Sequence, residues 1–190
     1  MRHPQILSRE GSVLLVCDVQ KRCIKPISRK ETMINNIKTL ISFSGMVGLP
    51  ILLTELSPQT FGGTIEEIKK MIPRLEPIKR SRYSCFGNED LTLRLEAMNT
   101  NTLVIVGMET HVSVCQTALD ALTRGYKVHL VLDASSSRRK SDWRAAIDKM
   151  RTAGAVITTM EMVMHEIMER VDAPNYDKFQ ELVGSIGREF

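Results

Sequence analysis

Short apolar runs alternate with longer amphipathic stretches along the chain. The runs are five or six residues long and rich in Val, Ile and Leu, at 12–17, 49–54, 75–79, 102–107, 127–132 and 154–159. Continuous apolar runs of this length are typical of strands buried on both faces. Stretches of helix length lie between them, at 29–46, 88–98, 110–124 and 141–152.

This alternation predicts a parallel sheet with helices on both of its faces. Six strands joined by right-handed crossovers form an α/β, three-layer αβα sandwich of the Rossmann-like kind. The tail at 171–190 is expected to add a last helix over 175–186, where apolar residues recur at helical spacing. We interpret that apolar stripe as core or subunit contact rather than as a site.

Length and composition fit one domain over 1–190. The 190 residues are 43% hydrophobic and 25% charged, which is enough for a full core. The net charge of +4 is below that of a polybasic nucleic-acid binder. Four cysteines without paired spacing favour reduced thiols, and no apolar run reaches the roughly 18 residues of a membrane span. We expect a soluble cytoplasmic protein, although two arginines near the N-terminus are compatible with a mitochondrial targeting signal.

Polar side chains follow the predicted strands at their carboxyl ends, where the ligand sites of open parallel sheets gather. Asp18 follows a buried run, so its carboxylate must be paired or functional. We interpret Asp18 as a general base or as an anchor held by a nearby cation. Asp133 lies in a similar place but precedes a serine-rich turn that it could cap, and this structural role is favoured.

Two basic clusters follow later strands. One cation of Lys79–Arg82 could point at Asp18 or at an anionic substrate, although a solvated loop is the default for such a run. The cluster Arg138–Lys140 should lie on the same rim, so RNA is a second possible anion. Aromatic residues make up only 5% of the chain and no stacking platform is present, which disfavours nucleic acid as a partner.

Other site types lack their signatures. There is no G-x-G-x-x-G after the first strand and no G-x-x-x-x-G-K-[ST], so neither a dinucleotide site nor a phosphate loop is expected. The four histidines are scattered without ligand spacing. We therefore expect no cofactor and no metal.

Four ordered segments carry a family resemblance: "LLVCDVQ", "PIKRSRYSCF", "GMETHVSVCQTALDAL" and "RGYKVHLVLDASSSR". Together they resemble the isochorismatase-like cysteine hydrolases, most closely the isochorismatase domain-containing branch, over about 12–167. The resemblance implies a triad in which an aspartate takes the thiol proton, a lysine balances the charge and a cysteine attacks a carbonyl or related carbon. It also implies a homo-oligomer that acts on a small-molecule substrate.

The triad positions of the family are only partly matched. Asp18 takes the aspartate position, with Gln20 as the glutamine that commonly follows it. The lysine position falls on Arg80, while Lys79 lies one residue away and would need a bulge to enter the site. The nucleophile position falls on Ser113.

Cys115 lies two residues beyond Ser113, about 200° away around an α-helix. It shares a stripe with Val112, Leu119 and Leu122 that should pack on the sheet, so we interpret it as a small buried hydrophobe. A serine hydroxyl is much harder to ionise than a thiol, and the guanidinium at the lysine position does not give up a proton.

Three hypotheses follow. In the first, Asp18, Arg80 and Ser113 form a site with weakened or lost cysteine-hydrolase activity that binds a small anionic metabolite. In the second, the chain is an active hydrolase of a small amide, ester or enol ether and uses Ser113, or Cys115 through a shifted helix. The third, a non-catalytic RNA- or protein-interaction module, is least favoured. The substrate-binding residues expected around the site are Gln20, Lys79, Met108, Glu109 and Thr110. Nicotinamidase activity is disfavoured, because the loop after the second strand has no histidine.

Overall fold

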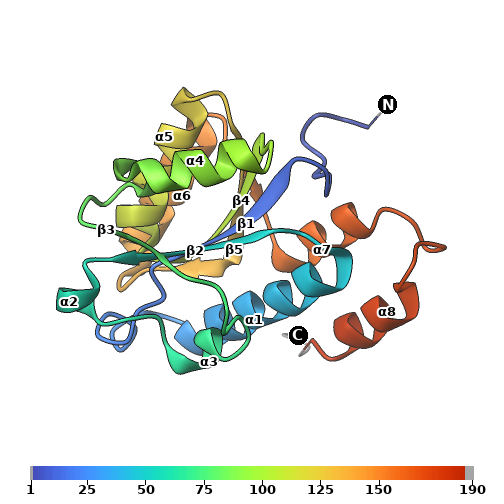
Figure 1. The fold of residues 1–190 in the computed structure, drawn as a ribbon, viewed down its shortest axis with the longest axis horizontal. Coiled ribbons are helices and arrows are strands. Elements are labelled where there is room, and N and C mark those ends of the chain that lie inside the picture. The colour runs from blue at the N-terminus through green and yellow to red at the C-terminus, as the bar shows by residue number, and fades with distance from the viewer. Residues whose placement is uncertain (1, 187–190) are drawn as a thin grey trace.

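A six-stranded parallel sheet forms the centre of the molecule in the computed structural model, which describes residues 2–186 (Figure 1). The sheet order is β3-β2-β1-β4-β5-β6. The strands are β1 (Ser12–Cys17), β2 (Ile51–Leu56), β3 (Ile78–Arg80), β4 (Thr102–Met108), β5 (Lys127–Ser136) and β6 (Val156–Thr158). The predicted three-layer αβα fold with six strands is confirmed.

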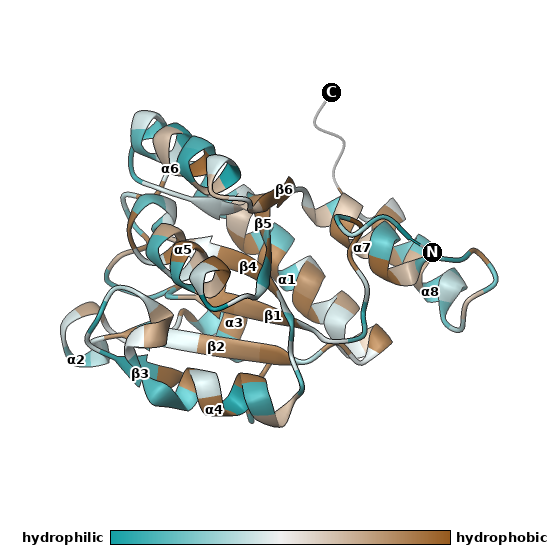
Figure 2. Ribbon diagram, turned by 90° about the horizontal axis from the view of Figure 1, so that it is seen from above, coloured by the Kyte–Doolittle hydropathy of each residue, from teal (hydrophilic) through white to brown (hydrophobic). Residues whose placement is uncertain are grey.

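Helices cover both faces of the sheet (Figure 1). One face carries α1 (Lys30–Val47), the short α3 (Glu66–Lys69), α7 (Met160–Met168) and α8 (Tyr176–Gly184). The other carries α4 (Glu89–Ala97), α5 (Cys115–Thr123) and α6 (Lys140–Thr152). The central strands are apolar along most of their length, as Figure 2 shows for β1 and β4, because both faces of the sheet are buried under helices.

The order in which strands are added to the sheet changes direction between β1 and β4. It builds outward from β1 to the edge strand β3 and then returns to lay β4 on the other side of β1. Such a switch point opens a crevice at the carboxyl ends of the two strands. Gly107 of β4 lies opposite Cys17 of β1 and has a φ of +117°. A Cβ there would lie 2.1 Å from the Cys17 carbonyl oxygen, so only glycine allows the strands to approach this closely.

Several local predictions need correction. The helix α7 and the short helices α2 (Pro58–Phe61) and α3 were not predicted. The stretch predicted as one helix at 110–124 begins with a π-helical turn over Thr110–Val114 and continues as α5. Asp133 accepts a 2.9 Å hydrogen bond from the Met160 amide at the start of α7, a contact that was not predicted.

The tail helix is present as α8, and it packs on the core as its apolar stripe predicts. Phe179 is fully buried, with its ring centroid 5.8 Å from that of Phe43 in α1. The last residues of the predicted tail, 187–190, lie outside the described part of the chain. Within residues 2–186, no helix is long and apolar enough to cross a membrane.

Candidate active site

Asp18 and Arg80 form a buried ion pair at the carboxyl edge of the sheet. Asp18 follows β1 directly, with a left-handed backbone (φ 53°) that turns its side chain toward β2 and β3. Arg80 donates from Nη1 to Oδ1 over 2.7 Å and from Nη2 to Oδ2 over 2.6 Å. The Arg80 side chain is 0% exposed and that of Asp18 is 7% exposed. Two parallel charge-assisted bonds of this kind are the strongest form of arginine–carboxylate pairing.

The pair is held by further contacts. Thr54 of β2 donates a 2.8 Å hydrogen bond from its hydroxyl to Asp18 Oδ1, and Arg80 Nη2 donates to the Tyr83 carbonyl over 3.0 Å. Burial opposes the charge of Arg80, but its hydrogen bonds to Asp18 prevail and raise the pKa of Arg80 above its ordinary value. The guanidinium therefore stays charged, and both of its terminal nitrogens donate to Asp18.

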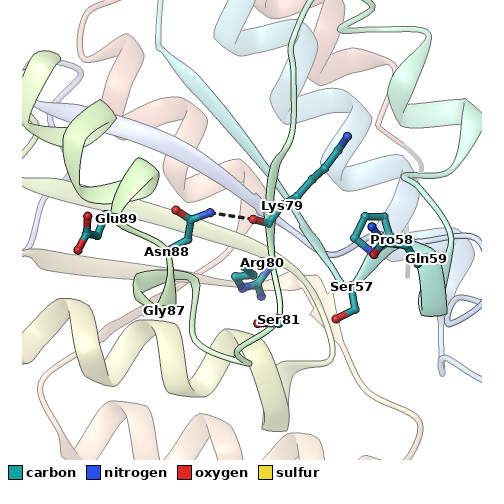
Figure 3. Close-up of a pocket in the computed structure, with 9 residues that line it drawn as sticks. All are labelled: Ser57, Pro58, Gln59, Lys79, Arg80, Ser81, Gly87, Asn88 and Glu89. Atoms are coloured by element: carbon teal, nitrogen blue, oxygen red, sulfur yellow. Dashed lines mark hydrogen bonds between the residues drawn. The ribbon is translucent and has the colours of Figure 1, made fainter.

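Lys79 points away from this pair. In β3, Ile78 and Arg80 are buried while Lys79 between them is exposed, and the register with β2 runs without a bulge. Figure 3 shows the Lys79 side chain extending away from Arg80, while its carbonyl accepts a 2.7 Å bond from Asn88. Strand alternation thus brings Arg80, not Lys79, to Asp18.

Ser113 lies in the π-helical turn that follows β4. It is 2% exposed, and its hydroxyl makes no hydrogen bond to any described residue. The nearby imidazole of His111 is turned elsewhere, since its Nδ1 lies 3.0 Å from the hydroxyl of Ser137. No base is therefore in hydrogen-bond contact with Ser113 within residues 2–186.

Cys115 belongs to the core on the α5/α6 side. It is 5% exposed and packs in the cluster that contains Ile147 of α6. Burial raises the pKa of its thiol, and the charge that opposes this is that of Lys149, also on α6. The wider π-helical turn shifts the phase of the helix, so the sheet-facing residues are Val114, Ala118 and Ala121 instead of the stripe predicted through Cys115.

The five expected substrate-binding residues have different surroundings. Gln20 is 1% exposed, and its amide bonds the Leu56 amide and the carbonyls of Leu56 and Gly62. Both of its N–H groups are used, so Gln20 ties the loop after β2 to β1 and has none left for a ligand. A role of Gln20 in substrate binding stays a prediction.

The other four stay predictions as substrate-binding residues, and their surroundings differ. Met108 is 1% exposed and packs in the α1-side core, whereas Lys79 is exposed on β3. Glu109 accepts a 3.0 Å hydrogen bond from Arg138 Nε. Thr110 is fully buried and its hydroxyl has no partner among the described residues.

Three site residues were missed by sequence reasoning. Besides Thr54, two thiols lie beneath the ion pair: the sulfurs of Cys17 and Cys85 are 3.9 Å apart, and Cys85 Sγ lies 3.7 Å from Thr54 Oγ1. The contact with Cys85 and burial raise the pKa of Cys17. Cys17 adjoins Asp18 in the sequence, but 68 residues separate the two cysteines, so no local pattern could pair them.

An open hollow of about 650 Å³ lies beside the pair, on the edge of the sheet (Figure 3). Its walls are the loop after β2, the strand β3 and the start of α4, and its polar side chains include those of Ser57, Lys79, Ser81 and Asn88. Asp18 and Ser113 do not line it. In the described part of the chain, no three His, Cys, Asp or Glu side chains are grouped to hold a metal ion.

Comparison with known proteins places the chain in a family. The isochorismatase domain model matches residues 12–162. The chain belongs to the isochorismatase family. Isochorismatase family protein 1A of Dictyostelium discoideum is 33% identical over 165 residues, which cover 85% of this chain and 80% of that protein.

Solved structures of similar proteins share this isochorismatase fold. The structure described as MAR1 ribonuclease from Caenorhabditis elegans has a TM-score of 0.86 and 30% identity, covering 96% of this chain and 94% of that one. The YcaC gene product of Escherichia coli, described as an octameric hydrolase of unknown specificity, has a TM-score of 0.86 and 24% identity, covering 97% and 98%.

Proposed function

We propose that this isochorismatase family protein has a weakened or lost cysteine-hydrolase reaction, with Asp18, Arg80 and Ser113 at the three triad positions. This proposal is supported by the closed, buried pair of Asp18 and Arg80 and by the Ser113 hydroxyl, which has no base in hydrogen-bond contact among the described residues. A serine hydroxyl needs a well-placed base to become a nucleophile.

The ion pair cannot supply proton transfer as a lysine–aspartate pair would. Both oxygens of Asp18 already accept hydrogen bonds from Arg80. An arginine does not release a proton in proteins, so the pair has no proton to pass to a leaving group. Cys115 offers no substitute, because its thiol is buried under α6 and burial raises its pKa.

We further propose that the hollow beside Arg80 binds a small anionic metabolite. Arg80 is committed to Asp18, so its charge is not available to a ligand. Lys79 lines the hollow, and its ammonium group has no ion pair within the described residues. The hydroxyls of Ser57 and Ser81 and the amide of Asn88 add hydrogen-bonding groups around it. The octameric Escherichia coli relative supports a homo-oligomer, which light scattering would test.

Turnover measurements test the loss of hydrolysis. The natural chain and Ser113→Ala are assayed side by side on p-nitrophenyl acetate and on small amides. The proposal expects equal, background rates for both. A natural rate that Ser113→Ala abolishes would support an active serine hydrolase instead, and one that Cys115→Ala abolishes would support a shifted helix.

Ligand titration tests the anion site separately. Calorimetry with citrate and with inorganic phosphate is expected to show binding that Lys79→Gln weakens by about tenfold, as expected for loss of one charge-assisted contact. Lys149→Gln on α6 serves as the matched control and leaves binding unchanged. Equal affinity in the natural chain and Lys79→Gln contradicts this location.

A further inference from the structure

Positive charge is concentrated in two short segments of the chain. Residues 19–30 contain five Lys or Arg and no Asp or Glu, and residues 137–141 contain three and none. These eight charges exceed the net charge of +4, so the rest of the chain carries a net charge of −4. We call the eight side chains the cationic rim: Lys21, Arg22, Lys25, Arg29, Lys30, Arg138, Arg139 and Lys140.

The fold joins the two segments into one surface. The first follows β1 and the second follows β5, so both leave the carboxyl edge of the sheet, at the side of the molecule where α2 lies (Figure 1). Ser28 links them directly: its amide donates to the Ser137 carbonyl over 3.1 Å, and its carbonyl accepts from the Ser136 hydroxyl over 2.5 Å. The rim therefore borders the edge that carries Asp18.

The rim is exposed and only partly neutralised. Seven of the eight residues are exposed and Lys30 is half-buried. Lys21 pairs with Glu66 over 2.6 Å, Arg138 with Glu109 over 3.0 Å and Lys30 with its neighbour Glu31 over 3.8 Å. Solvent-exposed pairs of this kind contribute about 0–1 kcal/mol, so an incoming anion can compete for these cations.

Three cations of the rim have no acidic partner in the described part of the chain. Lys25, Arg139 and Lys140 make no ion pair with any described residue. These three come from both segments, so the unpaired charge extends over the whole rim and is not confined to one loop. An extended row of unpaired cations suits a polymer of regularly spaced charges better than a small anion.

We propose that the cationic rim binds nucleic acid through its phosphates, without reading bases. Four of its residues are arginines, whose planar guanidinium groups match phosphate oxygens. Neither segment contains an aromatic residue on which a base could stack. An anionic membrane surface fits less well, because the large apolar side chains exposed on the described residues, such as Tyr83 and Met162, lie outside both segments.

This inference revises the expectation from sequence. The sequence grouped Arg138–Lys140 with Lys79–Arg82, but Arg80 is buried against Asp18 and is no part of an exposed patch. The fold instead adds residues 19–30, whose five cations are spread over twelve positions and do not form a compact run. The proposed binding by the cationic rim does not depend on the proposed loss of hydrolase activity, because the rim contains none of the residues at the triad positions.

Fluorescence anisotropy with labelled, mixed-sequence oligonucleotides tests the rim in the intact chain. Single-stranded RNA, single-stranded DNA and duplex DNA form separate arms. We expect binding that falls steeply as salt rises, because bound phosphates release counterions. The triple variant Lys25→Ser, Arg139→Ser, Lys140→Ser should bind about tenfold more weakly or worse, with a smaller salt slope.

The matched control removes the same charge elsewhere. Arg74→Ser, Lys149→Ser, Lys178→Ser changes three exposed cations outside the rim and should alter affinity less than about twofold. Equal weakening by the two triple variants would show a general charge effect and overturn the proposal. Absence of oligonucleotide binding at low salt, or rim-dependent binding of anionic vesicles or acidic peptides alone, would overturn it as well.

Discussion

Arg80 donates hydrogen bonds of 2.7 and 2.6 Å to the two carboxylate oxygens of Asp18. This contact links the carboxyl end of β1 to the carboxyl end of β3. The contact depends on two backbone features. The left-handed conformation of Asp18 turns its side chain, and the alternation of β3 points position 80 inward and position 79 outward. Together these two features hold the opposite charges of Asp18 and Arg80 in a closed, buried pair.

The first prediction concerns removal of the cation. Arg80→Met leaves the Asp18 carboxylate buried without its partner, and this should lower the free energy of unfolding by about 3–5 kcal/mol. Urea denaturation followed by circular dichroism measures the change. Lys79→Met, one position away but solvent-exposed, is the control and should stay within about 0.5 kcal/mol of the natural chain. Similar losses in both variants would mean that the pair does not stabilise the fold.

A second prediction concerns the close approach of β1 and β4. Gly107→Ala would place a Cβ 2.1 Å from the Cys17 carbonyl at a φ that side chains rarely adopt. The expected destabilisation exceeds about 4 kcal/mol, which in a domain of this size can prevent folding. Gly45→Ala on the exposed face of α1 meets no atom within 4 Å and should instead stabilise by about 0.5–1 kcal/mol. A Gly107→Ala protein with natural thermal stability would contradict the observed strand spacing.

A third prediction concerns pH. Burial, with a smaller effect of the Lys127 charge, lowers the pKa of His129 to about 4. Its ordinary value is about 6.5, so the unfolded chain takes up the proton first as pH falls. His129 should therefore have no effect on stability above pH 6.5 and should reduce it progressively between about pH 6.5 and pH 4, by on the order of 2 kcal/mol.

Urea titrations at a series of pH values test this assignment. His129→Leu should remove that part of the decline in stability, whereas His3→Gln, at an exposed position, should retain it. An unchanged decline in His129→Leu would assign the effect to other groups.

The layers of the fold were predictable because buried parallel strands are continuous apolar runs. Five of the six strands were placed within about two residues of their observed start, and the exception, β3, is a three-residue edge strand with little apolar pattern of its own. The helix α7 was missed since its Met-rich sequence follows β6 almost without a break. The π-helical turn was not predictable, because its register depends on the tertiary packing that buries Val114 and Ala118 in the core.

Tertiary contacts decided the details of the site. The sequence placed Arg80 at the family's lysine position and left Lys79 as an alternative that would need a bulge. The register of β3 against β2 has no bulge, and Arg80 contacts Asp18. Thr54 was overlooked because a threonine in a strand has no chemical signature by itself. The hydrogen bonds of the Gln20 side chain were not predicted, because its amide group bonds backbone atoms of the loop after β2, which no local pattern records.

The central claim is that replacement of the family's lysine and cysteine removed the reactivity of this site. The most direct measurement compares p-nitrophenyl acetate hydrolysis by the natural chain with that of Ser113→Cys and of Ser113→Cys combined with Arg80→Lys. A thiol at the start of a helix, beside a lysine and Asp18, ionises far more readily than a serine hydroxyl. The account predicts no turnover above background for the natural chain and at least about tenfold more for the double variant. Enzymatic turnover by the natural chain, or a double variant as inert as the natural chain, would contradict it.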